Sequence, residues 1–153
     1  MKPKYFVLDV DGVLSTGQFL YSGEGKVYKI FGPHDADGLK MVKDRIKISF
    51  ISADRRGFSI SKRRLMDMGY PLHQVSEEER GVFIEKKFGL KNVIYMGDGY
   101  HDAGLLKACA FGIAPANARK EAKKAAHFVT ESGSGEGAVL DACLEIIKRY
   151  FKS

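Results

Sequence analysis

Short apolar segments alternate with longer amphipathic segments along the chain, beginning with Tyr5 to Leu8. Short apolar runs bounded by polar or glycine-containing turns are typical of buried strands, whereas apolar residues at helical spacing indicate helices. This regular alternation predicts an α/β fold, a Rossmann-like doubly wound parallel sheet with helices on both faces. The predicted strands are 5–8, 46–51, 72–75, 92–96, 111–114 and 127–130.

The predicted helices lie between these strands. Ser76 is expected to be the N-cap of one of them, with Glu79 at the capping-box position. A glycine-rich loop, 132–137, leads into a final helix whose apolar residues fall on one face. The predicted helices are about 34–44, 58–68, 77–88, 103–108, 117–126 and 138–150.

One part of the pattern departs from this alternation. Segments 18–21 and 27–31 have the composition of strands, and Ser22-Gly23-Glu24-Gly25 between them is a turn sequence. We therefore expect a β-hairpin directly after the first strand.

Composition fits one soluble globular domain over residues 1–153, with 44% hydrophobic and 29% charged residues. No segment has the length of a membrane span, and no signal-peptide pattern precedes the first strand, so we expect a cytoplasmic protein without a membrane partner. Cys109 and Cys143 form no metal-binding pattern and are expected to be buried thiols.

The net charge of +6 is compatible with an anionic substrate or with nucleic acid. A basic cluster, 55–56 with 62–64, follows the second strand of the predicted sheet. Since no nucleic-acid motif or interleaved aromatic residues accompany the basic residues, we expect no nucleic-acid partner.

Polar side chains follow three separate predicted strands. Asp9 and Asp11 follow the first, Ser52 the second in the sheet, and Asp98 and Asp102 lie in a turn after 92–96. The carboxyl ends of parallel strands share one edge of a sheet, where α/β folds bind ligands. Neighbouring carboxylates repel each other unless a cation lies between them or one is protonated. Taken alone, Ser52 is equally well explained as a helix N-cap.

These motifs resemble those of the haloacid dehalogenase superfamily of phosphotransferases: Asp9-Val10-Asp11-Gly12-Val13, Ser52, and Gly97-Asp98-x-x-x-Asp102. Segments 9–17, 31–39, 95–102 and 134–139 resemble more narrowly the 3-deoxy-D-manno-octulosonate 8-phosphate phosphatases. The N-acylneuraminate 9-phosphate phosphatases belong to the same subfamily. The resemblance implies a phosphatase acting on a small phosphorylated sugar acid.

The resemblance also implies roles for these residues. Asp9 would be the nucleophile that forms an aspartyl phosphate, and Asp11 the general acid and base. Mg²⁺ would be held by Asp9, the backbone carbonyl of Asp11, and Asp98. Ser52 would donate a hydrogen bond to a phosphoryl oxygen, and Asp102 would orient the metal waters.

The sequence departs from the family pattern at several positions, among them Ser52-Ala53, where the relatives have Thr-Gly. The superfamily has a Lys early in the helix before the Gly-Asp strand, where this chain offers Arg80 as the substitute cation. Gly99 and His101 replace an acidic residue and an Asn of the close relatives. Substrate contacts transferred by position or proximity would be Gly12, His34, Asp35, Lys40, Ala53, Arg55 and Arg64.

The spacing between Asp11 and Ser52, and between Ser52 and Asp98, leaves no room for a cap domain. The resemblance implies a homotetramer whose hairpins, about 17–31, cover the neighbouring sites. Three alternatives stay open from sequence: a capless phosphatase of a nucleotide or macromolecule, a catalytically weak oligomerisation or regulatory domain, and a phosphoacceptor signalling domain.

Overall fold

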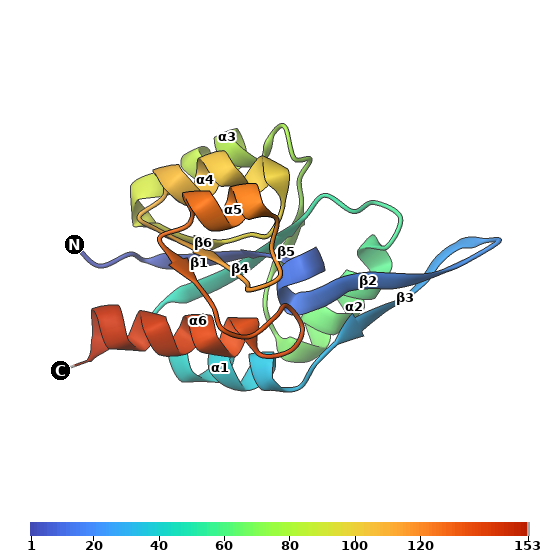
Figure 1. Ribbon diagram of the computed structural model, residues 1–153, viewed down its shortest axis with the longest axis horizontal. Coiled ribbons are helices and arrows are strands. Elements are labelled where there is room, and N and C mark those ends of the chain that lie inside the picture. The colour runs from blue at the N-terminus through green and yellow to red at the C-terminus, as the bar shows by residue number, and fades with distance from the viewer. Residues whose placement is uncertain (153) are drawn as a thin grey trace.

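The computed structural model describes residues 1–152, which form a six-stranded parallel sheet with helices on both faces and a separate two-stranded hairpin (Figure 1). The strand order is β5-β4-β1-β6-β7-β8, which confirms the predicted doubly wound α/β fold. The sheet strands are β1 (Tyr5–Asp9), β4 (Lys47–Ser52), β5 (Leu72–Gln74), β6 (Val93–Met96), β7 (Phe111–Ala114) and β8 (Phe128–Val129).

Two helical layers cover the sheet. Helices α1 and α6 contact each other on one face, while α3, α4 and α5 lie on the other (Figure 1). The six α-helices are α1 (His34–Val42), α2 (Phe58–Met68), α3 (Arg80–Lys87), α4 (Ala103–Ala108), α5 (Lys120–Ala125) and α6 (Ala138–Ile146).

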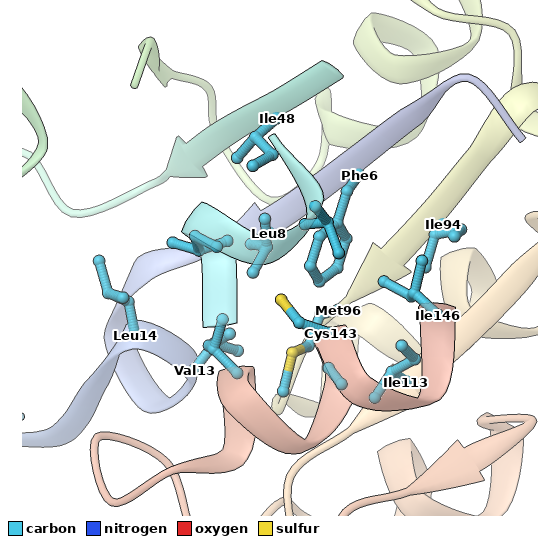
Figure 2. Close-up of a cluster of buried hydrophobic side chains, with 14 of the residues drawn as sticks. Phe6, Leu8, Val13, Leu14, Ile48, Ile94, Met96, Ile113, Cys143 and Ile146 are labelled. Carbon is cyan, nitrogen blue, oxygen red and sulfur yellow. The ribbon is translucent and has the colours of Figure 1, made fainter. Parts of the chain in front are cut away.

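The central strand β1 is buried on both faces because its side chains alternate between two cores. Phe6 and Leu8 join the core under α1 and α6, whereas Val7 joins the core under α3 to α5. Figure 2 shows Phe6 and Leu8 facing Cys143 and other α6 side chains. Burial of each such side chain contributes about 1.5–3 kcal/mol, so this apolar packing fixes the strand that carries Asp9.

The hairpin formed by β2 (Ser15–Ser22) and β3 (Gly25–Phe31) is present and longer than predicted. It projects away from the sheet and its helices (Figure 1). Its turn-proximal residues are mostly exposed, although several are large and apolar. The exposed apolar side chains of the hairpin are Phe19, Leu20, Tyr21, Val27, Tyr28 and Ile30.

Helix α3 begins at Arg80 and not at Glu77 as predicted. The Ser76 hydroxyl does accept a hydrogen bond from the Glu79 amide at 3.2 Å, as an N-cap would. The Glu79 side chain makes no capping bond, however, and the Glu77 carboxylate lies 3.2 Å from His101 instead. Residues 77–79 therefore form a turn, and Arg80 becomes the first residue of the helix.

Helix α5 begins at Lys120, three residues later than the predicted start at Asn117. The Asn117 side chain accepts a hydrogen bond from the Ser134 amide at 2.9 Å and donates one to the Ser134 hydroxyl at 3.0 Å. These contacts with the glycine-rich loop keep Asn117 in a turn before the helix.

Cys109 and Cys143 are free thiols within the two cores, which confirms the prediction of burial. Among residues 1–152, no helix has both the length and the apolar character needed to span a bilayer.

Candidate active site

The carboxyl end of β1 leads directly into the turn Val10–Leu14, where the chain reverses over the sheet edge. Asp11 has extended backbone angles, and Gly12 has a φ of 79°, which a glycine adopts without strain. A Cβ at Gly12 would also collide with the Asp98 carboxylate. Gly12 is thus required both for the turn and for the close approach of the β6–α4 loop to β1.

A pocket of about 560 Å³ lies at this edge of the sheet. The strand-end residues that the sequence singled out converge there, as predicted from the parallel topology. The predicted site residues that line it are Asp9, Asp11, Ser52, Ala53, Arg80, Asp98 and Asp102.

Three carboxylates gather at the base of this pocket. Asp9, Asp98 and Asp102 each place an oxygen within 4.8 Å of the other two. Both oxygens of Asp102 already accept hydrogen bonds: Oδ1 from Tyr95 at 2.6 Å and Oδ2 from the amides of Asp98 and Gly99 at 3.1 and 2.8 Å. Asp9 and Asp98 are therefore better placed than Asp102 to bind a cation directly.

Arg80 provides the positive charge next to these carboxylates. Its side chain is buried, and Nη1 lies 3.4 Å from Asp9 Oδ2, 3.3 Å from Asp102 Oδ1 and 3.0 Å from Tyr95 Oη. The late start of α3 places Arg80 at the helix end that faces the pocket. Tyr95 was not identified from sequence, because an aromatic residue in a buried strand is normally only part of the core.

The clustering of acids shifts their ionisation. Burial, followed by the charges of Asp102, Asp98 and Asp11, raises the pKa of Asp9, although Arg80 opposes the shift. Burial and the Asp102 and Asp11 carboxylates likewise raise the pKa of Asp98 to about 7. A divalent cation would relieve this repulsion and favour the ionised forms.

The Ser52 hydroxyl lies at the end of β4 and accepts a hydrogen bond from the Asp54 amide at 3.1 Å. Within residues 1–152, no protein acceptor takes its hydroxyl hydrogen, although the residue is nearly fully buried. The hydroxyl is therefore free to donate to an oxygen of a molecule in the pocket.

Two lysines of β3 also reach this region, and sequence reasoning missed both. Lys29 Nζ lies 2.9 Å from both Asp11 Oδ2 and Asp54 Oδ2, and Lys26 Nζ lies 2.8 Å from Asp54 Oδ2. Although burial opposes it, the hydrogen bonds from Lys26 and Lys29 lower the pKa of Asp54. The available signal was the charged position 29 within the apolar segment 27–31.

Asp35 does not reach the pocket, contrary to the expectation from its sequence position. Its carboxylate is fully buried, and Oδ1 accepts hydrogen bonds from the Val139 and Leu140 amides at 3.0 and 3.3 Å. Burial raises its pKa, while these amides oppose the shift. Asp35 therefore stabilises the N-terminus of α6 by accepting hydrogen bonds from two amides of its first turn.

Five more predicted substrate contacts are likewise absent from the pocket lining, and one of them is Gly12, which packs against the Asp98 carboxylate. His34 and Lys40 are exposed on α1, and Arg55 is exposed in the loop after β4. Arg64 donates a hydrogen bond to the Gly32 carbonyl at 3.4 Å, so it connects α2 to the end of β3. Position in the sequence alone did not reveal that these side chains point elsewhere.

The chain resembles known proteins over nearly its whole length. A family model described as haloacid dehalogenase-like hydrolase matches residues 80–142. The 3-deoxy-D-manno-octulosonate 8-phosphate phosphatase of Haemophilus influenzae is 32% identical over 156 residues, covering 98% of this chain and 86% of that relative.

Solved structures give the same picture. The crystal structure of 3-deoxy-D-manno-octulosonate 8-phosphate phosphatase from Moraxella catarrhalis, in complex with magnesium ion, phosphate ion and a KDO molecule, has a TM-score of 0.85 and 30% identity, with coverage of 95% of this chain and 86% of that chain. The cobalt-bound enzyme of Haemophilus influenzae has a TM-score of 0.84 and 29% identity, covering 96% of this chain and 88% of that chain. The chain therefore belongs to the haloacid dehalogenase-like hydrolases, in the family of the 3-deoxy-D-manno-octulosonate 8-phosphate phosphatases, and is a phosphoric monoester hydrolase.

Proposed function

We propose that this phosphatase uses Mg²⁺ to hydrolyse a small phosphorylated sugar acid, with 3-deoxy-D-manno-octulosonate 8-phosphate as the first candidate. The observation that carries the proposal is the convergence of Asp9, Asp98 and Asp102 within 4.8 Å, beside Arg80 in one pocket. The substrate class is supported by the names of the relatives and by the KDO molecule in the Moraxella catarrhalis structure.

The donor set fits Mg²⁺. Carboxylate and carbonyl oxygens are its preferred ligands, and a cation would favour the ionised forms of Asp9 and Asp98, whose pKa values are raised by burial and by neighbouring carboxylates. The proposed ligands are the carboxylates of Asp9 and Asp98 and the backbone carbonyl of Asp11, with Asp102 orienting metal-bound water. When bound, Mg²⁺ offsets the repulsion between Asp9 and a phosphate dianion.

In the first chemical step, a carboxylate oxygen of Asp9 attacks phosphorus and the bond to the sugar oxygen breaks. The electron pair goes to the sugar oxygen, which takes a proton from Asp11. In the second step, water attacks the phosphorus of the aspartyl phosphate and gives a proton to Asp11. The electron pair of the broken bond returns to Asp9, and inorganic phosphate is released.

Arg80 and Ser52 are the proposed ligands of the phosphoryl oxygens. The Arg80 guanidinium is already adjacent to Asp9, so a phosphate approaching Asp9 meets a fixed positive charge. The hydroxyl hydrogen of Ser52 has no protein acceptor and can be donated to a phosphoryl oxygen. Ala53 and Gly12 are proposed to leave space for the substrate, since one lines the pocket and the other lies against Asp98.

We further propose that the enzyme is a homotetramer assembled through the hairpin. Six large apolar side chains are exposed on β2 and β3, and an isolated hairpin of this kind is marginally stable in water. Their burial between subunits would stabilise the hairpin and cover the open pocket, over which residues 1–152 form no cap domain.

The test is phosphate release from a panel containing 3-deoxy-D-manno-octulosonate 8-phosphate, N-acylneuraminate 9-phosphate and common sugar and nucleotide phosphates. We expect selective turnover of a sugar-acid phosphate, its loss with EDTA, and its loss in Asp9→Asn. Asp44→Asn, at an exposed site away from the pocket, is the matched control. Turnover of nucleotides in preference to every sugar acid would refute the proposed substrate class.

A further inference from the structure

Lys29 is the single buried lysine among residues 1–152, and its ammonium has polar partners. Nζ lies 2.9 Å from Asp11 Oδ2, 2.9 Å from Asp54 Oδ2 and 2.8 Å from the Ser61 hydroxyl. Of the three hydrogen-bond donors of the ammonium, one is given to Asp11 and one to Ser61, and the Asp54 carboxylate forms a second ion pair beside them. Because a buried charge is costly without such partners, the Lys29 ammonium is confined to this position.

The contact with Asp11 fixes the orientation of its carboxylate. Lys29 occupies Oδ2, while the Ser15 hydroxyl donates to Oδ1 at the longer distance of 3.3 Å. The Asp11 side chain is still 33% exposed and lines the pocket. The carboxylate is therefore held from behind and stays accessible to a molecule in the pocket.

Lys29 is held in turn by residues outside the reaction. The Asp54 carboxylate also accepts from Lys26 at 2.8 Å and from the Gly57 amide at 3.1 Å. Gly57 permits this arrangement, since a Cβ there would lie 2.7 Å from Lys29 Cε. Lys26 and Lys29 thereby join the hairpin to the loop after β4, and Lys29 also joins it to α2 through Ser61.

We propose that Lys29 is a positioning residue that orients Asp11 for both of its proton transfers. With Oδ2 bound to the ammonium, Oδ1 is the oxygen that carries the proton to the sugar oxygen and later receives one from water. This inference rests on the proposed phosphatase chemistry and adds the hairpin of the same chain to the catalytic machinery.

The test uses Lys29→Met with p-nitrophenyl phosphate, whose leaving group departs as a stable anion without a proton from Asp11. The first step then survives, whereas hydrolysis of the Asp9 phosphate slows. We expect a rapid stoichiometric burst of p-nitrophenolate, a fall in steady-state turnover of about 100-fold, and accumulation of phosphorylated Asp9 detected by intact-protein mass. Turnover of an alkyl phosphate should show no burst of the released alcohol.

Lys62→Met, an exposed lysine of α2, is the control for loss of a positive charge. Ser61→Ala removes one partner of Lys29 and leaves Asp11 unchanged. We expect the same burst and the same accumulation of phosphorylated Asp9, with a smaller fall in steady-state turnover. This second variant carries the test if Lys29→Met does not fold. If a folded variant loses both the burst and the steady-state turnover, the proposed role of Lys29 is overturned. Wild-type kinetics in both variants would overturn it as well. Absence of turnover of p-nitrophenyl phosphate and of every phosphate in the panel by the wild-type enzyme would instead overturn the phosphatase activity itself.

Discussion

The guanidinium of Arg80 lies 3.4 Å from the carboxylate of Asp9, although the two residues are far apart in the sequence. The same nitrogen, Nη1, also lies 3.0 Å from Tyr95 Oη and 3.3 Å from Asp102 Oδ1. Tyr95, Asp9 and Asp102 raise the pKa of Arg80 despite its burial, so the charge is permanent. The chain thus places a fixed cation where the resemblance led us to expect a Lys.

Arg80→Met should lower kcat/KM by about 10²–10³-fold, since a preorganised charge of this kind contributes about 3–4 kcal/mol to transition-state stabilisation. Arg80→Lys should recover only part of this loss, because Nη1 is the guanidinium nitrogen next to Asp9, Asp102 and Tyr95, and a Lys has no second nitrogen to bind a phosphoryl oxygen at the same time. Steady-state kinetics with the preferred sugar phosphate is the measurement. Arg63→Met is the control, because Arg63 is exposed and pairs only with Asp67 on the surface of α2. Full activity in Arg80→Met would exclude a role in phosphate binding.

The positions of some active-site residues could be predicted from the sequence alone, and those of others could not. Asp9, Ser52 and Asp98 were identifiable because strand ends of a parallel sheet meet at one edge, so local patterns determine their position. Lys29 was not, because its place depends on how the hairpin folds back over α2. Asp35 is the opposite case, because the sequence predicted a substrate contact that the structure does not place in the pocket. Its segment resembles the family, but its carboxylate caps α6.

Mg²⁺ affinity should depend on pH through Asp98. Its pKa of about 7 means that a proton competes with the metal ion below neutrality. We expect affinity to fall by at least about tenfold per pH unit below pH 7, because the pKa of Asp9, the second proposed carboxylate ligand, is raised as well. Calorimetric titrations at several pH values, in buffers of different ionisation enthalpy, would report both the affinity and the released proton. Equal affinity at acidic and neutral pH would contradict this assignment, and Asp98→Asn should bind Mg²⁺ far more weakly throughout.

The stability of the metal-free protein should fall as pH rises from about 4 to about 7. An aspartate in the unfolded chain has an ordinary pKa of 3.8, whereas the pKa of Asp98 in the folded state is about 7, so the folded state binds more protons across this window. A state that binds more protons loses stability as protons become scarce. Thermal unfolding in EDTA should therefore show a decreasing Tm over this range, and excess Mg²⁺ should reduce or reverse the trend. A flat EDTA profile would mean that Asp98 ionises normally in the fold.

Tyr95→Phe should destabilise the enzyme by about 1–3 kcal/mol. The Tyr95 hydroxyl donates to Asp102 Oδ1 at 2.6 Å and accepts from Arg80 at 3.0 Å, and all three side chains are buried. Its removal leaves both charged partners less well satisfied and frees Arg80 to move relative to Asp9, so kcat should fall as well. Chemical denaturation and steady-state kinetics measure the two effects. Tyr5→Phe is the control, and a loss of stability without a loss of kcat would show that Tyr95 does not position Arg80.

The hairpin should control the oligomeric state. Leu20 is 60% exposed on β2 and would be buried in the proposed assembly, so Leu20→Asp places a charge in an apolar interface. We expect the tetramer to dissociate, as measured by light scattering coupled to size-exclusion chromatography. Met66→Asp is the matched control, because Met66 is 64% exposed on α2 and outside the hairpin. If both variants keep the wild-type mass, the hairpin is not the contact. If Leu20→Asp dissociates but keeps its KM, the hairpin assembles the subunits without covering the neighbouring pocket. The hairpin would then contribute to the active site only through Lys26 and Lys29 of the same chain.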